Sequence, residues 1–263
     1  MTLPENLGTE KHQIYNMDCL LGLAELPNNS IDLVVTSPPY PSAAMWKESK
    51  ETLYKLSYNV IDLLAQKVKL GAMVAWNIGD FPNPDNAGLE LAVARTALYF
   101  ESKGFIMRDH IVWHKGSAHL PPPSFLRRPC VVNYDWESIL VFSNGPRVIT
   151  DPKIVMEKEF RSINATSVWK MATARAKDVG HIAPFPVELP RRCIGLFSRP
   201  GDLVVDPFLG AGTTLMAAKM LDRRGIGFEL DKTYCELART RLGTVTERLD
   251  SFNEVPVTQT QLA

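Results

Sequence analysis

A short stretch of the sequence combines a hydroxyl group, two prolines and an aromatic ring: Ser37-Pro38-Pro39-Tyr40. These groups suit the chemistry of an exocyclic amine on a nucleobase, a weak nucleophile because its lone pair is delocalised into the ring. Acceptors that bind the amine hydrogens draw the nitrogen toward a tetrahedral, nucleophilic form. Ser37 Oγ and the Pro38 carbonyl are candidate acceptors, and Tyr40 offers a flat face for a stacked base. A strand-ending turn with a packed tyrosine is the alternative that the motif alone leaves open.

A second group of residues lies toward the C-terminal end of the sequence. Leu203–Asp206 is predicted to be a strand, Pro207–Gly212 a tight glycine-containing turn and Thr213–Leu221 a helix. The acidic Glu229 ends the next predicted strand, about 20 residues past the loop, a spacing typical of sites that hold an adenosine-bearing cofactor. Glu229 would accept hydrogen bonds from both ribose hydroxyls. A purely structural turn is the alternative.

The residues of this loop favour S-adenosylmethionine over a dinucleotide or ATP. The loop departs from the usual dinucleotide pattern and contains no phosphate-binding Gly-Lys-Ser/Thr. Asp206 is expected at the strand end, near a helix N-terminus, where its negative charge would repel a pyrophosphate. The same charge would attract the positively charged amino-acid tail of S-adenosylmethionine.

The elements that must position both motifs alternate between apolar β-type runs and helices. Ile31–Thr36 and Met73–Ile78 are predicted to be buried parallel strands, and open α/β sheets bind ligands at the carboxyl ends of such strands. Phe105–Lys115 and Glu137–Phe142 alternate in the β pattern and predict an antiparallel edge. Helices are predicted over residues 53–69, 87–102 and 190–197.

Composition and charge limit the class of protein. The 263 residues include 29 basic and 29 acidic side chains, a balance that by itself argues against nucleic acid. Residues 103–192, however, hold 14 Lys and Arg against 8 Asp and Glu, which fits a local footprint for phosphates. A mixed, solvated surface is the alternative. Residues 144–182 are the least regular part of this region, and we predict that they form a small insertion facing the substrate.

Several classes of protein are disfavoured. The sequence has no run of 18 apolar residues, so no membrane span is expected, and the N-terminus lacks the pattern of a signal peptide. The cysteines are far apart and predict reduced thiols of a cytoplasmic protein. The histidines show no metal-binding spacing, so no metal is expected. The four cysteines are Cys19, Cys130, Cys193 and Cys235.

The two motifs, in this order, resemble the β-class DNA amino-methyltransferases, in which the Ser-Pro-Pro-Tyr motif precedes the cofactor loop. The resemblance implies a Rossmann-like, S-adenosylmethionine-dependent methyltransferase fold with a circularly permuted motif order. It also implies a mostly parallel seven-stranded sheet with an antiparallel edge, in a single domain over residues 1–263. The likeness covers nearly the whole chain, through further blocks at Asn16–Cys19, Ser30–Tyr40, Ile111–Lys115, Glu137–Phe142 and His181–Pro190.

The resemblance also implies site residues. Ser37, Pro38, Pro39 and Tyr40 would form the catalytic turn that holds a base flipped out of double-stranded DNA. Asp18 would bind the adenine amino group of the cofactor, with a plain helix N-cap as the alternative. The cofactor-binding residues that the resemblance implies are Asp18, Cys19, Phe185, Asp206, Phe208, Gly210, Gly212, Thr213 and Glu229.

The implied reaction is direct, in-line transfer of a methyl group to the exocyclic amine. Ser at position 37 is associated in this family with N4 of cytosine, and Asp or Asn there with N6 of adenine. We therefore expect N4-cytosine methylation, with N6-adenine as the alternative. The resemblance implies a homodimer and leaves a cognate restriction endonuclease open.

Three other classes are weaker interpretations. A cytosine-C5 methyltransferase needs a cysteine nucleophile, and Cys130 follows Arg127-Arg128 in a loop-like stretch unsuited to that role. Enzymes that methylate protein glutamine or RNA resemble the version with the cofactor loop first. An inactive relative that only binds DNA or cofactor is disfavoured by the intact motifs.

Overall fold

The computed structural model describes residues 3–40, 48–82, 88–116, 135–146, 165–174, 179 and 185–245. Cys130 and most of the predicted insertion at 144–182 lie outside the described residues. The strands are β1 (His12–Asn16), β2 (Ile31–Thr36), β3 (Val68–Ile78), β4 (Phe81–Pro82), β5 (Leu89–Glu90), β6 (Phe105–His114), β7 (Trp136–Asn144), β8 (Val168–Lys170), β9 (Leu203–Asp206) and β10 (Arg224–Glu229). The helices are α1 (Cys19–Glu25), α2 (Lys50–Lys67), α3 (Ala92–Ser102), α6 (Glu188–Phe197), α7 (Thr213–Met220) and α8 (Lys232–Thr244).

One large sheet forms the centre of the molecule, with the order β1-β10-β9-β2-β3-β7-β6-β8. The pairs from β1 to β3 are parallel, whereas β7 is antiparallel to both β3 and β6. This arrangement confirms the α/β class and the antiparallel edge. The seven expected strands are joined by the three-residue β8, which pairs in parallel with the outer side of β6.

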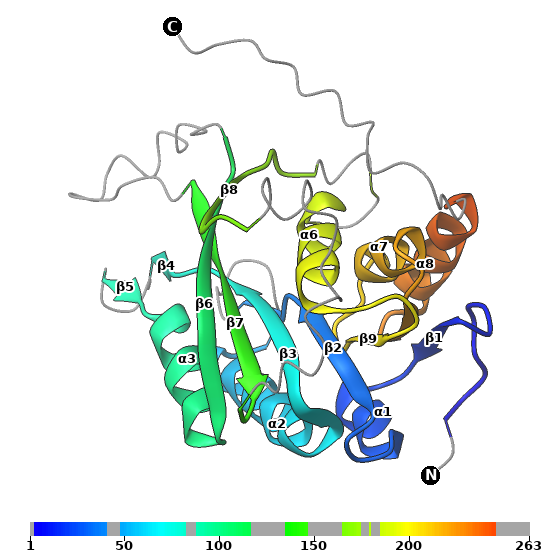
Figure 1. Ribbon diagram of the computed structural model, residues 1–263, viewed down its shortest axis with the longest axis horizontal. Helices are drawn as coiled ribbons and strands as arrows, with labels where there is room; N and C mark the ends of the chain where they lie inside the picture. The colour runs from blue at the N-terminus through cyan, green and yellow to red at the C-terminus, as the bar shows by residue number, and fades with distance from the viewer. Residues whose placement is uncertain are drawn as a thin grey trace, which may run out of the picture.

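Helices cover both faces of the sheet, with α1, α2 and α3 on one side and α6, α7 and α8 on the other (Figure 1). The central strands alternate their side chains between these two layers. Val34 and Trp76 pack in the core beneath α1, α2 and α3, while Val35 and Ala75 pack in the core beneath α6 and α7. A strand buried on both faces has a continuous apolar run as its sequence pattern, which is why Ile31–Thr36 was recognisable as a strand.

The helix ends show where local sequence was insufficient. Ser49 caps α2 through the Thr52 amide, close to the expected start. The helix expected from residue 87 begins instead at Ala92, because Leu89–Glu90 pairs with β4. Asp80 Oδ1 accepts the hydrogen bond of the Val93 amide at 2.8 Å and so caps α3 from outside the helix.

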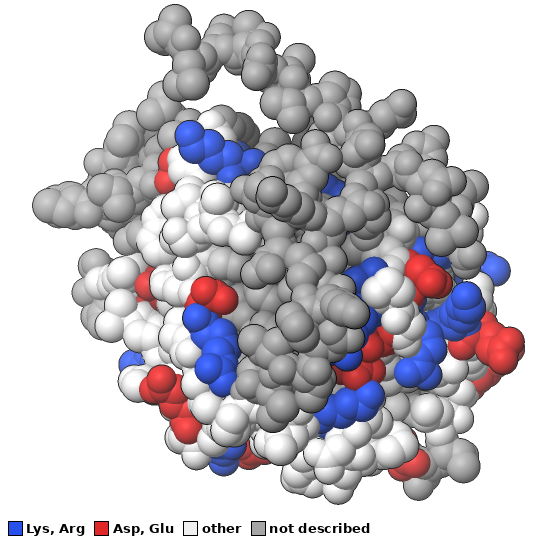
Figure 2. Space-filling view, viewed as in Figure 1, with Lys and Arg blue, Asp and Glu red and all other residues white. Residues whose placement is uncertain are grey.

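Charged side chains of the described residues are mixed in sign on the face shown in Figure 2. The basic surplus expected between residues 103 and 192 falls mainly on residues outside the described ranges. Among the helices that the structure describes, none combines the length and the apolar character needed to cross a membrane.

We predict that Gly22→Ala destabilises the protein. A Cβ at Gly22 would lie 2.3 Å from Cε1 of Phe228, a fully buried ring. Alanine ordinarily stabilises a helix interior by about 1 kcal/mol relative to glycine, but here the overpacking should lower the free energy of unfolding by about 1–3 kcal/mol. Urea unfolding measures the change.

Gly243→Ala in α8 is the matched control, because a Cβ there meets no atom of the described residues within 4 Å. Its stability should equal or slightly exceed that of the wild type. Equal stabilities of the two variants would contradict the close packing of α1 against Phe228.

Candidate active site

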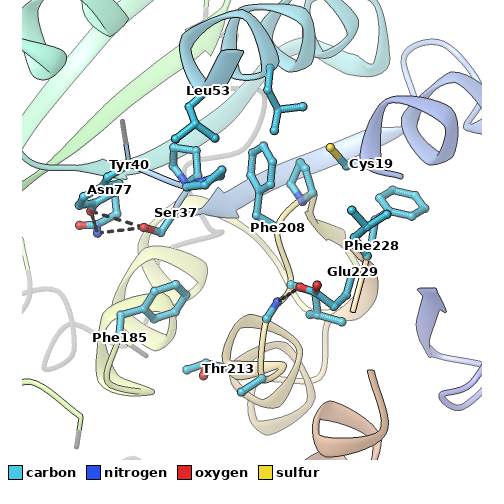
Figure 3. Close-up of a pocket in the computed structure, with 18 of the residues that line it drawn as sticks. Cys19, Ser37, Tyr40, Leu53, Asn77, Phe185, Phe208, Thr213, Phe228 and Glu229 are labelled. Atoms are coloured by element: carbon cyan, nitrogen blue, oxygen red, sulfur yellow. Dashed lines mark hydrogen bonds between the residues drawn. The ribbon is translucent and has the colours of Figure 1, made fainter. Parts of the chain in front are cut away.

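A cavity of about 560 Å³ lies at the carboxyl ends of the parallel strands (Figure 3). This volume is within the range of about 300–1,000 Å³ that is usual for small-ligand sites. Segments that follow four different strands line it: Met17–Cys19 after β1, Ser37–Tyr40 after β2, Pro207–Ala211 after β9 and Glu229 at the end of β10. The two motifs singled out in the sequence therefore face one space.

Glu229 lies at one end of this cavity and is held by backbone amides. Its Oε2 accepts the Gly210 N–H at 2.8 Å, and its Oε1 accepts the Asp231 N–H at 2.8 Å. Burial raises the pKa of Glu229, against the lowering effect of these amides. Each carboxylate oxygen has a second lone pair, so the side chain can still accept hydrogen bonds from two hydroxyls of a ligand.

Asp206 does not line the cavity but binds the backbone of the Pro207–Gly212 loop. Its Oδ1 accepts hydrogen bonds from Thr36 Oγ1 at 2.6 Å and from the Phe208 amide at 3.0 Å. The residue is 0% exposed, and burial raises its pKa to about 6, although the Thr36 and Thr214 hydroxyls and the Phe208 amide oppose this. Gly212, the other predicted cofactor residue that does not line the cavity, has φ 79° and would place a Cβ 2.7 Å from that of Ala238.

The remaining predicted cofactor residues line the cavity. Asp18 is the N-cap of α1, where its Oδ1 accepts the Leu20 amide at 2.7 Å. The side chain serves as the cap and still borders the cavity. Burial raises the pKa of the neighbouring Cys19 thiol to about 12, so this cysteine is not a nucleophile at neutral pH. The lining also includes Phe185, Phe208, Gly210 and Thr213.

The other end of the cavity holds the Ser37–Tyr40 turn and a polar network around it. Tyr40 Oη donates to Glu137 Oε2 at 2.7 Å, and Ser37 Oγ lies 3.4 Å from Tyr40 Oη. Asn77 Nδ2 donates to Tyr40 Oη at 2.8 Å and to Ser37 Oγ at 3.4 Å (Figure 3). It also donates to Glu137 Oε2 at 2.8 Å. Lys115 Nζ donates to Glu137 Oε1 at 2.5 Å. Burial, followed by the Glu137 carboxylate, raises the pKa of Tyr40 well above its usual value.

Sequence reasoning did not single out Asn77, Lys115 or Glu137. Asn77 lies near the end of a buried strand at a position where apolar residues are usual, and that signal could have identified it. Lys115 and Glu137 lie at ends of the predicted edge strands, and nothing local distinguishes them from solvated charges.

The lining also indicates what kind of ligand fits. Among the described lining residues Lys115 is the only Lys or Arg, and it lies at the Ser37–Tyr40 end, paired with Glu137. The Glu229 end offers Asp18 and Glu229, which suit an adenosine with a cationic tail and not a phosphate. This cavity, on this sheet and with this order of the two motifs, defines an S-adenosylmethionine-dependent methyltransferase.

The comparisons with known proteins refine that class. The family model described as DNA methylase, of the N6/N4 type, matches residues 31–240, and the chain belongs to this family. Type II methyltransferase M.MthZI of Methanothermobacter thermautotrophicus is 31% identical, over 93% of this chain and 79% of the relative. Type II methyltransferase M.MjaI of Methanocaldococcus jannaschii is 30% identical, over 86% and 89%.

A solved structure agrees with this family. TTHA0409 of Thermus thermophilus, assigned as a DNA modification methylase and solved in complex with S-adenosyl-L-methionine, superposes with a TM-score of 0.72. Its sequence identity is 28%, and the match covers 88% of this chain and 95% of that chain.

We predict that Glu229→Gln weakens S-adenosylmethionine binding by about tenfold or more, because an amide nitrogen cannot accept hydrogen bonds from ribose hydroxyls or from the Gly210 and Asp231 amides. Isothermal titration calorimetry measures the dissociation constant. Glu236→Gln, an exposed carboxylate on α8, is the matched control and should bind as the wild type does. Affinity of Glu229→Gln within twofold of the wild type would remove Glu229 from the cofactor site.

The raised pKa of Asp206 predicts a pH-dependent stability. Between about pH 4 and pH 6 the folded protein keeps a proton on this carboxyl that the unfolded chain has released. Raising the pH through that window therefore removes stability, by up to about 3 kcal/mol from this group. Asp206→Asn keeps an oxygen for Thr36 and Phe208 but cannot ionise, so it should not show this loss.

Urea unfolding of both proteins without cofactor, at intervals from pH 4 to pH 7, measures the difference in stability. The wild type should lose stability relative to Asp206→Asn as the pH rises. A difference that stays constant across the series would show that Asp206 does not carry the buried proton.

Proposed function

We propose that this protein methylates N4 of a cytosine that is flipped out of double-stranded DNA. The observation that carries the proposal is that the Ser37–Tyr40 turn and the cofactor residues line a single cavity. S-adenosylmethionine supplies an electrophilic methyl group on a sulfonium. The protein has to bring an amine into line with that group and make its nitrogen more nucleophilic.

The turn after β2 has the parts for this task. The Tyr40 ring provides a face for the flipped base, and its hydroxyl is tied to Glu137 and Asn77, which limits rotation of the ring. Ser37 Oγ and the Pro38 carbonyl accept the two amine hydrogens. A base packed against Phe185 and Phe208 would exclude water from the reacting atoms.

The preference for cytosine rests on Ser37. A hydroxyl is a neutral and weaker acceptor of the amine hydrogen, whereas a carboxylate is a charged acceptor. The resemblance associates serine at this position with N4-cytosine enzymes. N6-adenine is the second candidate, because the amine and ring nitrogen of adenine present the same local pattern of donor and acceptor.

The proposal extends to partners and organisation. The similar relatives are type II methyltransferases, so we place this protein in a restriction-modification system with an endonuclease of matching specificity. It would act in a prokaryotic cytoplasm as one methyltransferase domain, as a homodimer, with residues 144–182 contributing to DNA recognition.

Mass spectrometry of nucleosides tests the reaction. Amplified, unmethylated DNA is incubated with S-adenosylmethionine and the protein, and we expect N4-methylcytosine. N6-methyladenine would instead select the second candidate. The absence of both, with cofactor binding intact, would contradict the proposed reaction on DNA.

Ser37→Ala should abolish methyl transfer and leave the S-adenosylmethionine dissociation constant within about twofold, because Ser37 acts on the base. Ser102→Ala, at an exposed position on α3 where the hydroxyl donates to the Tyr99 carbonyl at 2.7 Å, is the control. Wild-type turnover by Ser37→Ala would contradict the acceptor role.

A further inference from the structure

Glu137 belongs to β7 and reaches the Ser37–Tyr40 turn from across the sheet. Its partner in the register of β6 is Trp113, two residues before Lys115. Gly79, just after β3, leaves room for this approach, because a Cβ there would lie 3.1 Å from Cγ of Glu137 and 3.8 Å from Cε2 of Tyr40. The Glu137 side chain is only 16% exposed. The fold therefore brings a carboxylate to the hydroxyl of Tyr40.

The hydrogen bonds of this carboxylate fix the direction of the neighbouring protons. A carboxylate only accepts, so the Tyr40 hydroxyl must donate to Glu137 Oε2. Asn77 Nδ2 donates to Tyr40 Oη and to Glu137 Oε2. With its own proton committed to Glu137, Tyr40 Oη can only accept from Ser37, 3.4 Å away.

Ser37 Oγ also accepts from Asn77 Nδ2, 3.4 Å away, and its second lone pair is left for the cavity. A serine hydroxyl can either donate or accept, and a donating Ser37 could not draw electron density onto the amine nitrogen. Once its proton points to Tyr40, Ser37 Oγ is an acceptor for the amine hydrogen. The Ser37–Tyr40 separation is long, and such contacts commonly shorten when substrate is bound.

We propose that Glu137 is a positioning residue for methyl transfer: it orients the protons of Tyr40 and Ser37 so that Ser37 accepts the amine hydrogen, and it receives the proton that the amine loses. This inference rests on the proposed function and concerns how the same site works. Lys115 Nζ donates to the other carboxylate oxygen of Glu137 at 2.5 Å, which fixes the orientation of the carboxylate toward Tyr40.

The hydrogen bonds from Ser37 through Tyr40 to Glu137 give the amine proton a complete path to an acceptor. The bond from nitrogen to the methyl carbon forms as the bond from sulfur to that carbon breaks, which leaves a neutral thioether and a cationic amine. The amine proton passes to Ser37 Oγ, the Ser37 proton to Tyr40 Oη and the Tyr40 proton to Glu137 Oε2. The products are a neutral methylated amine and a protonated Glu137, which can return its proton to solvent at its exposed edge.

A double-mutant cycle of Glu137→Gln and Tyr40→Phe tests the proposal on a duplex carrying the site mapped with the wild-type protein. Tyr40→Phe keeps the ring for stacking and removes the hydroxyl. Each single variant should lower kcat about a hundredfold, as expected for loss of a proton-transfer partner. The dissociation constant for S-adenosylmethionine and the KM for DNA should stay within about threefold.

The double variant should match either single variant within about threefold, because either change breaks the same chain. A kcat of Glu137→Gln above about a third of the wild-type value would overturn the proposal. So would a double variant whose loss is the product of the two single losses, or an effect on KM alone. If Glu137→Gln does not fold, the test uses Tyr40→Phe by itself. A kcat of Tyr40→Phe equal to that of the wild type would then overturn the proposal.

Asp62→Asn provides the matched control. Tyr99 Oη donates to Asp62 at 3.1 Å and Lys103 Nζ lies 2.8 Å from Asp62, so a carboxylate, a tyrosine and a lysine also meet between α2 and α3, outside the residues that line the cavity. The kcat of Asp62→Asn should equal that of the wild type within about twofold. Wild-type protein that methylates no DNA would refute the proposed function itself, an outcome distinct from failure of the Glu137 role.

Discussion

The hydrogen bond from Thr36 Oγ1 to Asp206 Oδ1 is the contact on which the rest of the site depends. It is 2.6 Å long, buried, and joins residues 170 positions apart in sequence. Thr36 ends β2 and Asp206 ends β9, neighbouring strands of the sheet, and the same Asp206 oxygen binds the Phe208 amide. The Ser37–Tyr40 turn and the Pro207–Gly212 loop, for which we propose base and cofactor binding, are therefore fixed to each other. Their spacing decides whether an amine and a methyl group can meet, and small errors in such spacing are costly to rate.

Charge is divided along the cavity in a way that fits the chemistry. Asp18 and Glu229 line the end of the cavity proposed for the cofactor, and their negative charge would attract a sulfonium with a cationic tail. The sulfonium charge disappears on transfer, so this attraction weakens in the product state. At the other end Lys115, the only Lys or Arg among the described lining residues, is paired with Glu137, so the charges of these two side chains offset each other.

The polar network around Tyr40 is assembled from separate strands. Asn77 comes from β3, Lys115 follows β6 and Glu137 comes from β7, and these strands are the antiparallel part of the sheet. The parallel strands carry the loop proposed for the cofactor and the turn proposed for the base, while the antiparallel edge contributes the side chains that bind the Tyr40 hydroxyl. A cofactor site and the polar network that supports the base-binding turn can thus lie on one sheet.

The sequence by itself determined the buried strands and the order of the two motifs, and through them the family. These signals are local: apolar β-branched runs, prolines after a strand, a glycine loop and an acidic residue at a set spacing. Only the tertiary structure decided that Asp206 points inward to Thr36, that α3 starts after a two-residue strand, and that Glu137 meets Tyr40. Each of these depends on contacts between residues far apart in the chain. Such contacts follow from strand order, register and the space left at Gly79, and no local pattern records them.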